Sequence, residues 1–177
     1  MKDRIKELRF ENRKLKKRIK ELEQKVLSLV GMLTIDDSKG SHKKGKVNDE
    51  IIRIMNETDD QLNIVSPKVD KFYTTEILRI AEKDIPVLLV TNDRRLYQEG
   101  YKKYYDQLKN KSNVTVISNP NVRYLLVFNS QEAVYSGGSL DKKELNKSIL
   151  IATYVKEKSK LTKIAEIFSN MLPSFMR

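Results

Sequence analysis

A seven-residue repeat of aliphatic residues runs through the first 33 residues of the chain. With Ile5 at heptad position a, eight of the nine a and d positions are aliphatic, and the ninth is Asn12. β-branched residues at a with leucine at d favour two parallel strands, and a single asparagine at a fixes the register. We therefore expect a parallel dimeric coiled coil over residues 1–34, so that the protein is a homodimer. The residues expected at this dimer interface are Ile5, Leu8, Asn12, Leu15, Ile19, Leu22, Val26 and Leu29.

An alternative for the same repeat is one amphipathic helix that packs on its own domain. Such a helix usually carries a wider apolar stripe than two seam positions in seven. The narrow stripe of this segment therefore favours the coiled coil over the packed helix.

Positive charge is concentrated outside the globular part of the chain. Residues 1–33 hold 11 Lys or Arg and five Asp or Glu, whereas residues 48–177 hold 20 and 17. Such a distribution attracts an anionic partner to the N-terminal segment. No base-reading region stands upstream, so sequence-specific binding in the major groove is not expected. We expect non-specific contact with nucleic acid phosphates, and the alternative is that these basic residues form a solvated outer face. The residues expected to make this contact are Arg13, Lys14, Lys17, Lys20, Lys43 and Lys44.

Two residue types that carry much of protein chemistry are scarce. The chain has no cysteine, and its one histidine, His42, lies in a polar basic stretch. Disulfides, thiolate sites, histidine metal clusters and Ser-His-Asp triads are therefore not expected, and we predict no metal and no cofactor. No apolar run approaches the roughly 20 residues of a membrane span, and the N-terminus lacks a signal-like apolar stretch. The expectation is a cytoplasmic protein without a membrane span.

Residues 35–47 are rich in glycine, serine and lysine without periodicity, which predicts a flexible basic linker. From residue 48 to 177 short helical patterns alternate with apolar runs that are typical of strands. We expect Asn48 and Thr74 to open two helices, and a third helix to cover residues 96–110. This order predicts an α/β domain with one mixed sheet flanked by helices, in which ligands bind beyond the carboxyl ends of the parallel strands.

Two features of the expected domain have both a functional and a structural interpretation. Tyrosines at helical spacing within residues 97–105 could stack on bases, but packing against the sheet with the hydroxyls at its rim is the favoured interpretation. Arg94 and Arg95 directly follow a buried strand, where they could bind an anion or lie in solvent.

The stretch from Asn119 to Val155 resembles the signature region of the phospholipase D superfamily. In active members a strand begins His-x-Lys and is followed by an aspartate, then by a Gly-Ser or Gly-Gly turn, and then by an Asn-x-Glu that opens another strand. The corresponding segments are Asn121-Val122-Arg123, Phe128, Ser136-Gly137-Gly138-Ser139-Leu140-Asp141 and Asn146-Lys147-Ser148. The order of expected elements from residue 48 also matches one such domain. The resemblance implies a phospholipase D-like fold preceded by the coiled coil.

Members of this superfamily hydrolyse phosphodiesters through a histidine that attacks phosphorus. Asparagine at position 121 is not nucleophilic, so the resemblance implies a degenerate domain that is not an enzyme. It also implies a remaining anion pocket with Arg123 at its centre. The residues expected around this pocket are Ser66, Arg94, Asn121, Arg123, Ser136, Gly137, Gly138, Ser139 and Asn146. Archaeal regulators of the TrmB type also join a coiled-coil segment to such a domain, but they begin with a winged helix.

Four functions remain open from the sequence. The first is a non-catalytic dimeric regulator or scaffold that contacts nucleic acid, or a complex associated with it, through the basic coil and linker. The second is a ligand-sensing module for a phosphorylated or sugar-like compound. A residual phosphodiesterase or nuclease and a structural adaptor whose coil recruits another helix are the third and fourth.

Overall fold

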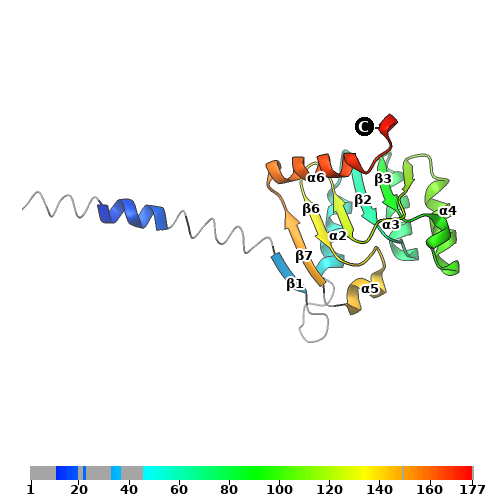
Figure 1. Cartoon of the computed structure of the whole chain (residues 1–177), viewed down its shortest axis with the longest axis horizontal. Helices are drawn as coiled ribbons and strands as arrows, with labels where there is room; N and C mark the ends of the chain where they lie inside the picture. Colours follow the sequence, from blue (N-terminus) through cyan, green and yellow to red (C-terminus); the bar gives the residue numbers. More distant parts are fainter. Residues whose placement is uncertain (1–10, 20–21, 23–32, 37–45, 149, 177) are drawn as a thin grey trace, which may run out of the picture. The chain divides into compact units, whose positions relative to one another are not determined.

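A computed structural model describes residues 11–19, 22, 33–36, 46–148 and 150–176 of the chain. The chain divides into two units, Met1–Thr34 and Ile35–Arg177. In the first unit residues 11–19 are helical and exposed (Figure 1). The side chains of Leu15, Ile19 and Leu22 are 60%, 54% and 54% exposed. Of the expected dimer seam, Asn12 is also described, whereas Ile5, Leu8, Val26 and Leu29 lie outside the described residues.

The second unit alternates helices and strands, as the apolar pattern predicts (Figure 1). The strands are β1 (Leu33–Asp36), β2 (Leu62–Ser66), β3 (Val87–Thr91), β4 (Val114–Ser118), β5 (Leu125–Phe128), β6 (Ala133–Ser136) and β7 (Leu150–Val155). The helices are α2 (Lys46–Glu57), α3 (Lys71–Ala81), α4 (Glu99–Lys109), α5 (Lys142–Lys147) and α6 (Lys158–Asn170). Two short 3₁₀ helices cover Arg94–Leu96 and Ser174–Met176. None of the helices in the described part of the chain is long and apolar enough to cross a membrane.

The strands form a mixed sheet in the order β1-β7-β6-β5-β2-β3-β4. Strands β2, β3 and β4 are parallel, and β5 pairs antiparallel with β2. Strands β6 and β7 continue the antiparallel pattern, so β6 runs in the direction of β2. The carboxyl ends of β2, β3, β4 and β6 therefore lie at one edge of the sheet, together with the start of β5. We call this edge the carboxyl edge.

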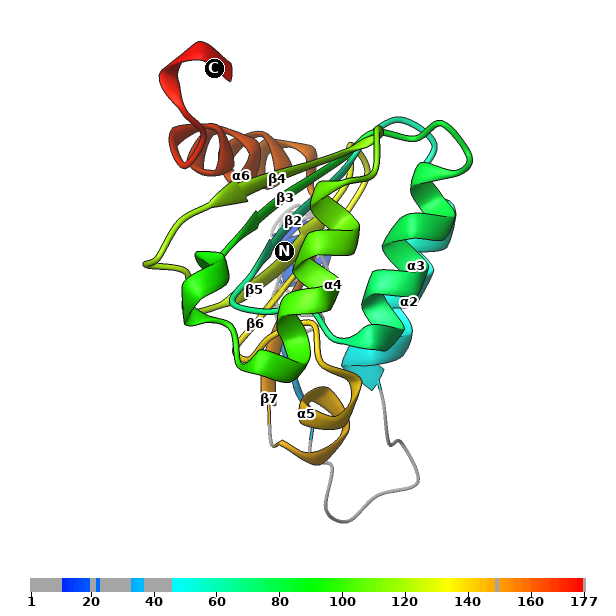
Figure 2. The same cartoon turned by 90° about the vertical axis from the view of Figure 1, so that its right-hand side faces the viewer.

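Helices cover both faces of this sheet, with α2, α3 and α4 on one side and α6 on the other (Figure 2). The first core joins α2, α3, α4 and α5 to strand residues such as Ile64, Leu89 and Val127. The second core joins α6 to the alternate strand residues, among them Val65 and Val90. The alternation follows from the two-residue period of a strand, which turns successive side chains to opposite faces. The predicted α/β class, with one mixed sheet flanked by helices, is thus confirmed.

Several element boundaries differ from the sequence prediction. Helix α3 begins at Lys71 instead of Thr74, because Asp70 caps it by accepting the Tyr73 N–H at 2.9 Å. Helix α2 begins before Asn48, whose Oδ1 instead accepts the buried Tyr73 hydroxyl at 2.7 Å. The coil and linker were expected to meet near residue 35, but strand β1 covers this junction.

The segment after the glycine turn also differs from the prediction. Asn146 was expected to open a strand, but it lies in helix α5, which Asp141 caps through the N–H groups of Lys143 and Glu144. The strand that follows, β7, begins at Leu150.

Candidate functional site at the carboxyl edge

Each strand that ends at the carboxyl edge has a hydroxyl residue as its last member. These residues are Ser66 in β2, Thr91 in β3, Ser118 in β4 and Ser136 in β6. Ser66, Thr91 and Ser136 are fully buried. The edge is therefore lined by small groups that both donate and accept hydrogen bonds.

Tyrosines from the α4 region bond to this row of hydroxyls. The Tyr97 hydroxyl bonds Thr91 Oγ1, and the Tyr105 hydroxyl lies 2.9 Å from Ser118 Oγ. Both tyrosines are almost fully buried, and burial raises the pKa of Tyr97 to about 12. The tyrosine stripe thus packs on the sheet with its hydroxyls at the rim, which was the favoured interpretation of its spacing.

A charged cluster lies where β2 ends and the glycine turn begins, which we call the Lys68 cluster. Lys68 Nζ lies 3.3 Å from Asp141 Oδ2 and 3.2 Å from Glu144 Oε2. The Ser139 hydroxyl donates to the same Glu144 oxygen at 2.6 Å. The Tyr101 hydroxyl donates to Asp141 Oδ2 at 2.6 Å, and the Lys68 ammonium lies 5.0 Å from the Tyr101 ring centroid. One cation, two carboxylates and two hydroxyls thus converge within one hydrogen-bonded group.

The cluster favours its ionised forms. Burial alone raises the pKa of Asp141, but hydrogen bonds from Tyr101 and the Glu144 N–H, together with the charge of Lys68, lower it on balance. For Lys68 burial lowers the pKa, yet the hydrogen bond and charge of Glu144 and the charge of Asp141 raise it. The hydrogen bond to Asp141, and then burial, raise the pKa of Tyr101. The cluster therefore combines a stable ammonium ion with a stable carboxylate beside the sheet edge.

The glycine turn holds this cluster through its backbone. Gly138 has φ +83°, and a Cβ there would lie 3.2 Å from Glu144 Oε1, so the position requires glycine on both counts. The Leu140 N–H donates to Ser66 Oγ at 2.8 Å, and Ser66 in turn donates to the Lys68 carbonyl at 2.6 Å. The expected pocket residues Ser66, Ser136, Gly137, Gly138 and Ser139 are thus brought together at the carboxyl edge.

The two arginines expected at the pocket make other contacts. Arg94 donates to both carboxylate oxygens of Asp106, at 2.6 and 2.7 Å. Arg123 Nη1 donates to the carbonyls of Pro120 and Val122, each at 3.0 Å. Asn121 is exposed, and its N–H donates to Asn119 Oδ1. Both arginines therefore lie outside the Lys68 cluster, which contains a cation that the sequence analysis did not select.

Phe128 is remote from the carboxyl edge because β5 is antiparallel to β2 and Phe128 is its last residue. The Phe128 ring packs edge-to-face on Phe168 of α6, with centroids 5.1 Å apart. It belongs to the second core and does not fill the candidate site.

The residues expected to contact nucleic acid are only partly described. Arg13, Lys14 and Lys17 lie in the exposed helical stretch of residues 11–19. Lys20, Lys43 and Lys44 lie outside the described residues, as does His42.

Comparison with known proteins gives relatives by structure alone. No protein-family model and no curated protein sequence matches the chain. NucT from Helicobacter pylori is 10% identical, with a TM-score of 0.64 over 78% of this chain and 92% of that one. Nuc from Salmonella typhimurium, a phospholipase D family member, is 6% identical with the same TM-score and coverage. The fold is that of the phospholipase D family.

A third solved structure extends beyond this phospholipase D-like domain. TrmBL2, an archaeal chromatin protein described as showing a novel mode of DNA binding, is 9% identical with a TM-score of 0.55. The match covers 94% of this chain and 65% of TrmBL2. It therefore includes part of the N-terminal segment, whereas the matches to NucT and Nuc each cover 78% of the chain.

These findings contradict the prediction that the chain is not an enzyme. The fold is shared with a phospholipase D family member, so it is one on which phosphodiester chemistry occurs. The altered residues Asn121 and Phe128 were the basis of the prediction, and they are not sufficient ground for excluding activity.

Proposed function

We propose that this chain is a dimeric nucleic-acid-binding regulator or scaffold. Its basic N-terminal helix contacts phosphates, and the phospholipase D-like domain follows this helix in the chain. The observation that carries the proposal is the exposed helix of residues 11–19, which presents Arg13, Lys14 and Lys17 to solvent. Lysine and arginine side chains that neutralise phosphates supply most of the affinity in sequence-independent binding.

The same helix supports the dimer. Leu15, Ile19 and Leu22 are each more than half exposed in a single copy of the chain. They occupy d, a and d positions of the heptad repeat, whereas Arg13, Lys14 and Lys17 occupy b, c and f positions on the outer side. A second copy would cover the three aliphatic side chains and leave the basic ones free for phosphate contact.

The similarity to TrmBL2 also supports the proposal. That protein is an archaeal chromatin protein whose structure is described as showing a novel mode of DNA binding, and it matches 94% of this chain. A coiled-coil arrangement of two such domains would place two sets of basic residues on one duplex.

The test measures the affinity of the full chain for a short DNA duplex by fluorescence anisotropy, at about 50 and about 200 mM salt. We expect affinity to fall steeply with salt, with a log–log slope of about −0.9 for each phosphate contacted. Replacing Arg13, Lys14 and Lys17 with Gln should weaken binding and reduce this slope.

A matched control removes the same charge from the domain, by replacing Lys83, Lys109 and Lys158 with Gln. These three lysines are also exposed, so non-specific loss of net charge would affect both variants equally. Equal weakening in the two variants, or no binding by the full chain at low salt, would contradict the proposal.

A second candidate function is phosphodiester hydrolysis at the carboxyl edge, which the Lys68 cluster favours. The Lys68 ammonium, which contacts Asp141 and Glu144, can also donate a hydrogen bond to a phosphate oxygen, and the Glu144 carboxylate, 2.6 Å from the Ser139 hydroxyl, can accept a proton. The described part of the domain contains no histidine, so such a reaction would use another nucleophile. Cleavage of a chromogenic phosphodiester that is lost in Glu144→Gln but kept in Glu166→Gln would establish this activity.

A further inference from the structure

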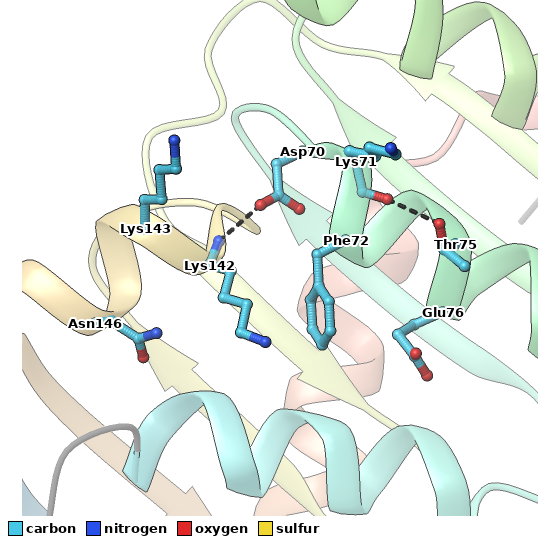
Figure 3. A pocket seen from close by; sticks show the side chains of 8 residues that line it. All are labelled: Asp70, Lys71, Phe72, Thr75, Glu76, Lys142, Lys143 and Asn146. Atoms are coloured by element: carbon cyan, nitrogen blue, oxygen red, sulfur yellow. Dashed lines mark hydrogen bonds between the residues drawn. The ribbon is translucent and has the colours of Figure 1, made fainter.

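A cavity that does not include the Lys68 cluster lies between the N-terminal parts of α3 and α5. Its volume is about 580 Å³, within the range of small-molecule sites. Figure 3 shows the eight residues that line it, with Phe72 between the side chains of Lys142 and Glu76. Three of the eight are lysines, namely Lys71, Lys142 and Lys143.

The two acidic residues that line this cavity, Asp70 and Glu76, do not pair with its lysines. Asp70 uses one carboxylate oxygen to cap α3 and the other to accept the Lys142 N–H at 2.9 Å. Glu76 is paired with Arg79 at 2.6 Å. Within the described residues no carboxylate lies in ion-pair distance of the three lysine ammonium groups. The cavity therefore attracts an anionic group.

The aromatic wall of the cavity is held in place. The Phe72 ring packs edge-to-face on Tyr73, with centroids 5.2 Å apart, and the buried Tyr73 hydroxyl is fixed by Asn48. The Lys142 ammonium lies 3.9 Å from the centre of the Phe72 ring. Because the lysine side chain is flexible, its ammonium can move onto a bound anion and free the ring face for a planar group.

One polar group at the cavity has an unused hydrogen-bonding capacity. Asn146 lines the cavity, and its Oδ1 is buried without a hydrogen-bond partner among the described residues. A buried amide oxygen without a partner is unfavourable, and a turn of the Asn146 side chain toward the cavity would let an N–H group of a ligand satisfy it.

We propose that this cavity binds a nucleoside monophosphate group, either as a free nucleotide or as the phosphorylated end of a nucleic acid strand. Lys142 and Lys143 bind the phosphate, the base stacks on Phe72, and an N–H donor of the base bonds Asn146 Oδ1. The site does not involve the coiled coil, so it extends beyond the proposed function and is independent of it.

The test is calorimetric titration of the full chain with AMP, adenosine and inorganic phosphate separately. AMP should bind saturably, and the two fragments should bind at least about tenfold more weakly, because each lacks one half of the contacts. Phe72→Leu keeps an apolar side chain but removes the ring, and it should weaken the affinity for AMP by at least about fivefold. Phe72→Tyr keeps the ring and should retain AMP binding. Replacing Lys142 and Lys143 with Gln should weaken the affinity for AMP by at least about tenfold, without changing the weak binding of adenosine.

The control variant is Lys147→Gln, an exposed lysine of the same helix that does not line the cavity. Competition by single-stranded oligonucleotides with and without a 5′-phosphate distinguishes the two sources of the ligand. Absence of saturable AMP binding, or equal affinity in wild type and Phe72→Leu, would overturn the proposal. Duplex binding that depends on Arg13, Lys14 and Lys17 would be unaffected by these variants, so the two proposals can fail separately.

Discussion

The main-chain N–H of Leu140 donates a 2.8 Å hydrogen bond to Ser66 Oγ, which joins the turn after β6 to the end of β2. The two residues are 74 positions apart in the sequence, and both are buried. This contact, with the neighbouring bond from Asp70 N–H to Leu140 O at 2.8 Å, fixes the glycine turn beside the Lys68 cluster.

Ser66→Ala should destabilise the domain by about 1–3 kcal/mol, because it leaves the buried Leu140 N–H without an acceptor. Urea unfolding followed by circular dichroism measures this change. Ser112→Ala, at an exposed position, is the control and should change stability by less than about 0.5 kcal/mol. A loss for Ser66→Ala no larger than that of the control would show that the bond does not stabilise the turn.

Glu132→Gln should cost about 1.5–3 kcal/mol, because Arg53 donates to both Glu132 carboxylate oxygens at 2.6 Å and the carboxylate is almost buried. The contact ties α2 to the β5–β6 hairpin. Glu57→Gln removes another partner of Arg53 that is 55% exposed, and it should cost less than about 1 kcal/mol. Urea unfolding of the two variants at neutral pH compares them, and equal losses would contradict this assignment.

The stabilisation by Glu132 should disappear in acid. Burial raises the pKa of Glu132, but the hydrogen bonds and charges of Arg53 and Lys156 lower it on balance. A carboxylate with a lowered folded-state pKa stabilises the fold above its unfolded pKa and loses that contribution as pH falls through the folded value. The difference in unfolding free energy between wild type and Glu132→Gln should therefore shrink below about pH 4.3. A difference that stays constant on acidification would contradict the lowered pKa.

Asp141→Ala should destabilise α5 by about 0.5–2 kcal/mol, because Asp141 Oδ1 caps the helix through two N–H groups. Asp141→Asn keeps a capping oxygen and should lose less stability than Asp141→Ala. The Tyr101 phenol should titrate at lower pH in Asp141→Ala, since the hydrogen bond to Asp141 raises its pKa in wild type. Ultraviolet titration against a Tyr101→Phe reference measures this shift, and an unchanged Tyr101 titration would contradict the contact.

Leu15→Glu should convert a dimer into a monomer, because it places a charge at a d position of the seam. Lys17→Glu, at an outer f position of the same helix, is the matched control and should remain dimeric. Sedimentation velocity of the full chain distinguishes the two states. A monomeric wild type, or a dimeric Leu15→Glu variant, would contradict the coiled-coil dimer.

The strands of the domain could be predicted because their signal is local. Runs such as Val87–Val90 and Leu125–Phe128 are fully apolar, and the residues that bound them break the pattern. Helix α5 was missed because its six residues, Lys142–Lys147, contain a single apolar side chain and no periodicity. Strand β1 was missed because its first residue, Leu33, occupies an a position of the heptad repeat that precedes it.

The candidate site was only partly predictable. The glycine turn and Ser66 were selected because the sequence resembles the signature region and the order of elements of a phospholipase D-like domain. Lys68 was not selected, since its partners Asp141 and Glu144 lie more than 70 residues away and nothing in the local sequence indicates the pairing. Arg94 was selected as a cation after a buried strand, but its partner Asp106 lies 12 residues further along, in α4. A helix-capping signal at Asp141 could have indicated α5, and with it the position of Glu144.

Asp70 joins the two walls of the cavity between α3 and α5. One of its carboxylate oxygens holds the first turn of α3 and the other holds the first turn of α5, so a single side chain spans the two walls. The distance between the backbones of Phe72 and Lys142 is therefore fixed by the hydrogen bonds of Asp70 to two main-chain N–H groups, and it does not depend on flexible side chains of the two residues. The proposed ligand would therefore be selected by its size, and Asp70→Ala would remove both the bridge between the two helices and one carboxylate that lines the cavity.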